Sequence, residues 1–254
     1  MNGNGVVGVA NNGVDAFGVW GSSTNGYAGY FSGKLNVNGK TTVNGTQTSA
    51  SIANGVDGVS GFSSLSGGNG LVGEANVGTN AYGVWGRSTS GFAGYFSGKV
   101  YVSGNLTART VQITGADFSE KFEVRRGETG LEPGMVVSID PANPGKLAVS
   151  AQAYDRRVVG ILSGAGGIRT GMLMGQPGTL ADGDQPVALS GRVYVWADAS
   201  NGPIAAGDLL TTSNVPGHAM KVTKHGKAQG AILGKAMTGL SNGRGLVLVL
   251  VTLQ

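Results

Sequence analysis

Residues 81–98 read AYGVWGRSTSGFAGYFSG, and residues 16–33 carry a near copy, AFGVWGSSTNGYAGYFSG. A shift of 65 positions aligns residues 4–42 with residues 69–107. Within each copy, a pair of apolar residues between two glycines, such as GVVG, GVWG or GLVG, recurs about every thirteen residues. Because a unit this short cannot enclose a globular core, we expect each repeat to bury its apolar side chains against a neighbouring repeat or chain.

The repeats have the composition of short β-strands joined by sharp turns. The chain contains 48 glycines among 254 residues, which disfavours helix, because an interior glycine costs about 1 kcal/mol relative to alanine. Segments such as AYGVWG, GFAGYF and KVYVSGN place β-branched and aromatic residues between glycines, and Asn-Gly pairs supply tight turns. Such strands leave edges and aromatic faces exposed, which closed symmetric association covers. We therefore predict an intertwined homotrimeric β-prism or β-helix shaft over residues 1–115, with a single-chain solenoid as the alternative.

The composition of the chain changes after Thr114, where Asn-Gly pairs become rarer and apolar segments become longer. Turn residues separate these segments at roughly ten-residue intervals, the spacing expected of an all-β barrel or sandwich. A helical turn is expected only near residues 151–157. We predict a small β-barrel-like distal domain over residues 116–254, so that the whole chain is all-β. The expected strands are residues 121–126, 135–140, 146–151, 157–164, 185–198, 208–213, 219–223, 228–237 and 245–253.

Both halves of the sequence resemble known fibre families. AFGVWGSSTNGYAGYFSGKLNVNG and AYGVWGRSTSGFAGYFSGKVYVSGNLTA look like the shaft repeats of bacterial and phage fibre proteins. YDRRVVGILSGAGG, GAILGKAMTGL and GRGLVLVLVTLQ resemble the C-terminal domain that follows such shafts in bacterial surface fibres. The turns at Glu132-Pro133-Gly134 and Gly207-Asp208 resemble those of small barrels of the β-clip type. These resemblances imply a trimeric fibre on a virion or a cell surface.

The opening of the second half carries the one tight cluster able to support nucleophilic chemistry. GADFSEKFEV, at residues 115–124, is similar to the start of the self-cleaving domain on some phage tail appendages and tail spikes. That resemblance implies autoprocessing by Asp117, Ser119 and Glu120, since a carboxylate beside a hydroxyl can act as its base. The family pattern reads closer to Asp-Tyr-Ala-Glu, and no scissile bond maps onto this sequence. The structural alternative is that Asp117 binds backbone in a turn and Glu120 pairs with an arginine.

The three tryptophans are predicted to have two different roles. Trp20 and Trp85 occupy matched positions of the repeat, where packing within the shaft or between chains is expected. Trp196 stands at the end of a predicted strand beside a loop, where its ring can face a sugar. We therefore assign a glycan-binding site to Trp196, Ser200 and Asn201.

The composition argues against cofactor, metal and nucleic-acid chemistry. The chain has no cysteine, and His218 and His225 are too few for a metal site within one chain, although one histidine from each of three chains is a geometric alternative. The net charge is +4, and clusters such as Arg125-Arg126 are too short for the basic stripe of a nucleic-acid-binding protein. The longest apolar run, GLVLVLVTL, is too short to span a bilayer, so no membrane insertion is expected.

These features predict a non-enzymatic, homotrimeric fibre or adhesin tip that recognises a cell-surface glycan or envelope component without a cofactor. Three weak sites on one rigid tip gain affinity through effective concentration rather than through strong single contacts. Two alternatives remain: a self-cleaving or chaperone-like trimerisation domain of a phage tail fibre, and a purely structural spacer. The expected location is extracellular, on a virion or a cell-surface fibre.

Overall fold

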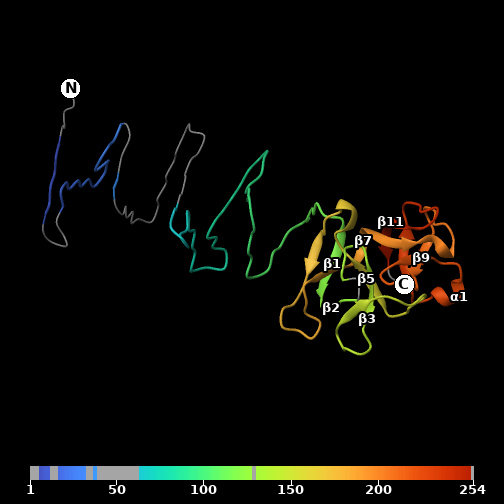
Figure 1. The fold of residues 1–254 in the computed structure, drawn as a ribbon. Helices are drawn as coiled ribbons and strands as arrows, with labels where there is room; N and C mark the ends of the chain where they lie inside the picture. The colour runs from blue at the N-terminus through green and yellow to red at the C-terminus, as the bar shows by residue number, and fades with distance from the viewer. Residues whose placement is uncertain (1–5, 12–16, 33–36, 39–62, 128–129, 253–254) are drawn as a thin grey trace, which may run out of the picture. The chain divides into compact units, whose positions relative to one another are not determined.

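The chain divides into two compact units, an N-terminal unit of residues 1–100 and a C-terminal unit of residues 101–254 (Figure 1). The predicted boundary between shaft and distal domain, at residue 115, falls just before the first strand, β1 (Asp117–Phe122). None of the helices in the described part has the length and apolar character needed to cross a bilayer. The computed structural model describes residues 6–11, 17–32, 37–38, 63–127 and 130–252.

The N-terminal unit contains extended segments and bends, and no strand is assigned among its described residues. The expected strands AYGVWG, GFAGYF and KVYVSGN are therefore not formed in the single chain. A β-strand is defined by hydrogen bonds to a neighbouring strand. In the described stretches before β1, the backbone bonds within this unit are confined to turns, such as Gly68 N–H to the Leu65 carbonyl.

The two repeats nevertheless have the same local structure. The rings of Phe17 and Trp20 lie edge to face, with centroids 4.7 Å apart and an interplanar angle of 69°. Tyr82 and Trp85 repeat this contact at 4.7 Å and 71°. The sequence repeat is thus a structural repeat in its described parts.

Glycine at the matched positions allows the chain to fold back closely on itself. A Cβ atom on Gly8 would overlap the carbonyl oxygen of Gly18, and a Cβ atom on Gly73 would overlap that of Gly83 in the same way. Any other residue would push the two backbone segments apart. Gly8 and Gly73 are therefore required by the conformation of the repeat.

The C-terminal unit is built around a closed barrel of five strands. β7 pairs with β11, β11 with β10, β10 with β8, and β8 with β9, all antiparallel, and a parallel pairing of β9 with β7 closes the ring. The expected β-barrel is confirmed, whereas the single chain does not test the trimeric shaft. The barrel strands are β7 (Gln185–Asp198), β8 (Leu209–Thr212), β9 (Ala219–Lys221), β10 (Ile232–Ala236) and β11 (Arg244–Thr252).

Alternating apolar residues of β7 and β11 fill the barrel. Because successive side chains of a strand point to opposite faces, every second residue is buried over residues 193–197 of β7 and 247–251 of β11. The buried set comprises Val193, Val195, Ala197, Val247, Val249 and Val251, with Leu210 and Leu233 from the facing strands.

The first half of β7 extends the sheet beyond the barrel. It pairs with β1 and with β5, and the sheet continues through β3 and β4 to β2, while β6 pairs in parallel with β1. A second apolar cluster, which includes Met135, Val137, Leu162 and Val187, holds this part together. Its remaining strands are β2 (Val124–Arg125), β3 (Val136–Ile139), β4 (Leu147–Val149), β5 (Val158–Leu162) and β6 (Met172–Met174).

The helical turn expected near residues 151–157 is wrong. Tyr154 in that segment has a φ of 57°, which no right-handed helix accommodates. The short helices lie elsewhere, at η1 (Ala165–Gly167), η2 (Ala199–Asn201) and α1 (His225–Ala228).

Candidate functional site

Asp117 and Ser119 lie together on the buried face of β1. Ser119 is fully buried, and its hydroxyl donates to Oδ2 of Asp117 at 2.5 Å. The other carboxylate oxygen of Asp117 accepts the backbone N–H of Gly171 at 2.9 Å, next to the start of β6. The two residues thus connect β1 with the segment that enters β6, and they place a hydroxyl beside a carboxylate.

Glu120 does not join this cluster. It follows Ser119 on the strand, so its side chain points to the opposite face of β1, where it is half-buried. Within the described residues it forms no ion pair, so the alternative pairing with an arginine is not formed there. The predicted triad is therefore split into a bonded pair and a separate carboxylate.

Trp196 is half-buried and packs against the second apolar cluster. Its backbone N–H donates to the carbonyl of Gly134 at 2.9 Å, and its ring centroid lies 6.2 Å from that of His218. The ring also contacts Gly134, because a Cβ atom there would lie 3.1 Å from Cδ1 of the indole. The indole therefore packs against other residues of the C-terminal unit, whereas the sequence predicts a ring that faces a ligand.

The predicted partners of Trp196 have structural hydrogen bonds. Ser200 donates its backbone N–H and its hydroxyl to the carboxylate of Asp198, at 3.2 and 2.7 Å. Burial raises the pKa of Asp198, but the bonds from Ser200 and the charge of Arg244 outweigh it, so the pKa lies below its usual range. The amide of Asn201 donates to the Lys221 carbonyl and to Thr223. These bonds fix the turn after β7.

The histidines do not form a metal site within the described residues, where no group of three or more potential ligands lies close enough to bind an ion. His218 binds the carbonyl of Pro216 through Nδ1 at 2.8 Å. His225 begins the exposed helix α1.

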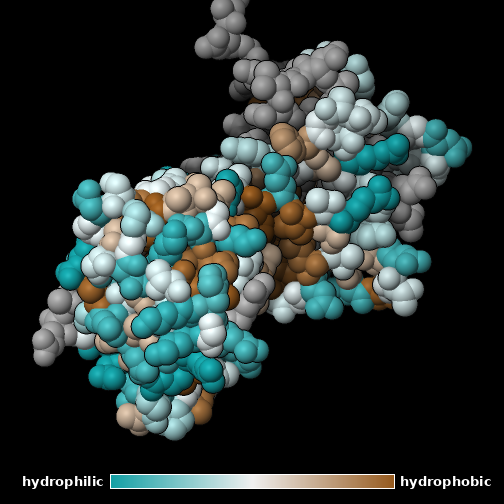
Figure 2. All heavy atoms as spheres, turned by 90° about the vertical axis from the view of Figure 1, so that its right-hand side faces the viewer, coloured by the Kyte–Doolittle hydropathy of each residue, from teal (hydrophilic) through white to brown (hydrophobic). Residues whose placement is uncertain are grey.

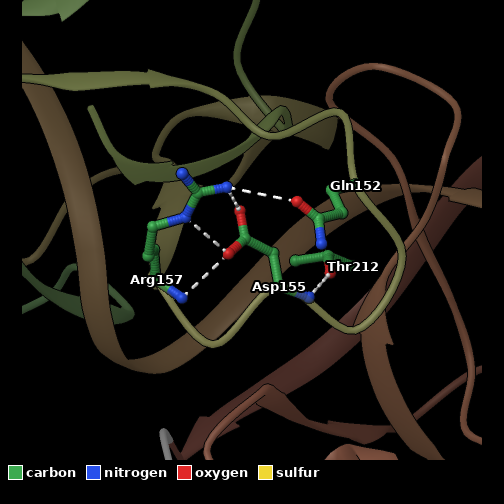
Figure 3. A network of polar contacts seen from close by, with 4 residues as sticks. All are labelled: Gln152, Asp155, Arg157 and Thr212. Carbon is green, nitrogen blue, oxygen red and sulfur yellow. Dashed lines mark hydrogen bonds and ion pairs between the residues drawn. The ribbon is translucent and has the colours of Figure 1, made fainter. Parts of the chain in front are cut away.

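Sequence reasoning missed a set of charged residues beside β3 and β5. Arg125 donates through Nε to Asp140 at 2.7 Å, and Arg157 donates through Nε to Asp155 at 2.9 Å. In Figure 3, the guanidinium of Arg157 also reaches Gln152, and the backbone of Asp155 donates to Thr212. Arg125 and Asp140 are 15 residues apart, and Thr212 is 57 residues from Asp155, so only the fold brings them together.

The two aspartates of this set are held in the ionised form. A hydrogen bond from Arg125, with others from Asn143 and Ala142, lowers the pKa of Asp140 to about 2. Burial raises the pKa of Asp155, but the hydrogen bonds from Arg157 outweigh it and lower this pKa as well. The set therefore presents two ion pairs in which the carboxylate is fixed.

Comparison with known proteins identifies no family, and no curated protein matches the chain. Among solved structures, the chain is similar to the pre-mature bacteriophage phi29 gene product 12, with 17% sequence identity and a TM-score of 0.39. The likeness covers 59% of this chain and 24% of that chain.

Proposed function

We propose that the chain is a subunit of a homotrimeric fibre, exposed on a virion or a cell surface, whose repeats associate with those of other copies. In this proposal the C-terminal unit is the tip that recognises a glycan or an envelope component. It acts by binding and not by catalysis.

The observation that carries the proposal is the exposure of aromatic side chains at matched positions of the repeat. In the single chain, Trp20 is 69% exposed and Trp85 is 67% exposed. Their neighbours Tyr27, Tyr95 and Phe92 are more than 80% exposed. Figure 2 shows apolar residues at the surface among hydrophilic ones. The same large aromatic side chains are exposed in both repeats, so burial against other copies is the expected arrangement.

The backbone of the repeats supports the same proposal. An extended segment carries an N–H donor and a C=O acceptor at each residue, and these groups are normally paired in a folded protein. The described repeats pair few of them within the chain. Strand pairing with other copies satisfies the donors and acceptors and covers the aromatic faces at the same time. Three-fold winding suits the pattern, because glycine fits where chains crowd an axis.

Multi-angle light scattering combined with intact mass tests the proposal. We expect three chains of full-length mass in each particle. A monomer at micromolar concentration with a cooperative β-sheet signal from the repeats would refute the fibre. Attachment of the labelled trimer to cells or to a glycan array then tests recognition.

Self-processing is the second candidate function, and one observation favours it. The hydroxyl of Ser119 donates to the carboxylate of Asp117, which is the contact that a general base makes with a nucleophile. The intact-mass measurement decides between the candidates. Loss of a fragment that Ser119→Ala prevents would favour self-processing, whereas full-length mass in the native protein favours the binding fibre.

A further inference from the structure

A surface pocket beside β3 and β4 is lined by side chains that can bind a ligand. We call it the arginine pocket. It is lined by Arg125, Asp140, Ser150, Gln152, Asp155 and Arg157, among other residues. The sequence shows Arg125 only as part of a short basic cluster and predicts no ligand-binding site here.

The ion pairs of the arginine pocket have a definite orientation. The side chain of Arg125 is 63% exposed, whereas that of its partner Asp140 is 1% exposed. In the second ion pair, the side chain of Arg157 is 43% exposed and that of Asp155 is 6% exposed. The carboxylates are thus buried behind the guanidinium groups. The groups that a ligand meets first are hydrogen-bond donors.

Several of these donors have no partner among the described residues. Arg125 uses only Nε in its bond to Asp140, so both of its terminal nitrogens are free within the described part of the chain. Arg157 uses Nε and Nη2, which leaves Nη1 free, as Figure 3 shows. Gln152 accepts a bond through Oε1, and its amide nitrogen donates to no other residue that the structure describes. Three side chains therefore present free N–H groups to one pocket.

A buried hydroxyl provides independent evidence for a missing partner. Ser150 lines the arginine pocket, is 1% exposed, and has no hydrogen-bond partner for its Oγ among the described residues. An unpaired buried hydroxyl costs about 1–3 kcal/mol, so such groups usually have a partner. Ser138 also lines the pocket with an unpaired Oγ, although this hydroxyl lies close enough to Asp155 to lower the pKa of that carboxylate. Ser150 is therefore the clearer case of an unpaired buried hydroxyl among the described residues.

We propose that the arginine pocket binds the oxyanion of an acidic saccharide, either a carboxylate or a phosphate group. The free guanidinium donors are the two terminal nitrogens of Arg125, which match the paired oxygens of a carboxylate or phosphate, and Nη1 of Arg157. The buried aspartates hold both guanidinium groups in place before binding, which reduces the entropy lost on association. The choice of a saccharide as the carrier of the oxyanion rests on the fibre function proposed above.

Equilibrium titration of the full-length protein with three defined probes tests this site. The probes are an oligogalacturonate, which carries carboxylates, a phosphorylated galactose oligomer, and a neutral galactose oligomer. We expect saturable binding of at least one charged probe and none of the neutral oligomer. Binding of one charged probe alone identifies which oxyanion the pocket prefers.

Gln152→Glu is the decisive variant, because it adds a negative charge at an exposed position. We expect it to weaken binding about tenfold, which corresponds to about 1.4 kcal/mol. Arg156→Gln is the matched control. It changes the net charge by the same amount at an exposed neighbour that does not line the arginine pocket, and it should leave affinity unchanged. Arg125→Lys retains the positive charge beside Asp140 but removes the two terminal nitrogens of the guanidinium group. It should also weaken binding.

Three results would overturn the inference: no saturable binding of either charged probe, equal binding of the neutral oligomer, or equal weakening by Gln152→Glu and Arg156→Gln. The last would indicate a diffuse charge effect rather than a site. Light scattering on the same samples keeps the two proposals separate. A trimer that binds no probe contradicts the arginine pocket alone, and a monomer that binds contradicts the fibre alone.

Discussion

Trp85→Ala tests whether the repeats bury their aromatic rings between chains. Trp85 is 67% exposed in the single chain, so of the roughly 250 Å² that a tryptophan can bury, about 170 Å² remains for a partner to cover. At about 25 cal/mol per Å², that area contributes about 4 kcal/mol for each chain of the assembly. If the ring stays in solvent instead, the substitution should change the free energy of unfolding by no more than about 0.5 kcal/mol.

Thermal unfolding of the full-length protein at a fixed concentration measures this difference. In a unit of 100 residues, a loss of about 4 kcal/mol per chain should lower the melting temperature of the repeats by roughly 16–32 °C, and the transition of the C-terminal unit should not move. Trp20→Ala should give a similar shift, because its contact with Phe17 repeats that of Trp85 with Tyr82. An unchanged melting temperature in both variants, with the tryptophan emission of a solvent-exposed ring, would refute the reasoning.

Four further changes test the C-terminal unit. Asp140→Asn should lower the stability measured in urea at pH 7. Because the folded pKa of about 2 lies below the ordinary 3.8, the contribution of Asp140 is complete above about pH 4 and is lost toward pH 2, where variant and native protein should converge. Tyr154→Phe removes the acceptor for the exposed N–H groups of Thr223 and Lys224 and should cost about 0.5–1.5 kcal/mol in the same assay. Trp196→Ala should destabilise the unit by about 2 kcal/mol, because its half-buried indole packs on the second apolar cluster; unchanged urea unfolding with lost glycan-array binding would instead support the ligand-facing role. Residues 101–254 alone should fold as a β-protein, as circular dichroism can show, since the barrel is closed within one chain.

The strands of the C-terminal unit were predictable where the sequence alternates strongly. QPVALSGRVYVWAD was expected to form a strand at residues 185–198, and β7 spans those residues. β6 was missed, because its three residues are all exposed and show no alternation. Its pairing with β1 depends on a neighbour about 50 residues away in the chain, which no local pattern records.

The arginine pocket was less predictable than the barrel, because its residues are far apart in the chain. Composition and spacing detect clusters that are close in the chain, such as Asp117 and Ser119, which the fold does bring into contact. Arg125 and Asp140 meet only because β2 pairs with β4 and β4 with β3. A tertiary ion pair of this kind has no signature in a single sequence.

The repeats show why residues with high β-propensity do not form a β-strand without a partner strand. The segments around Trp20 and Trp85 contain residues with high β-propensity, yet no strand forms in their described parts, since a strand requires a second row of donors and acceptors. The two repeats have the same local structure, so an arrangement that pairs one of them also pairs the other. Another copy of the chain offers the same groups in the same order, which a symmetric assembly brings into register. The predicted strands are therefore expected as a property of the assembled fibre, where both the backbone and the aromatic rings would find their partners.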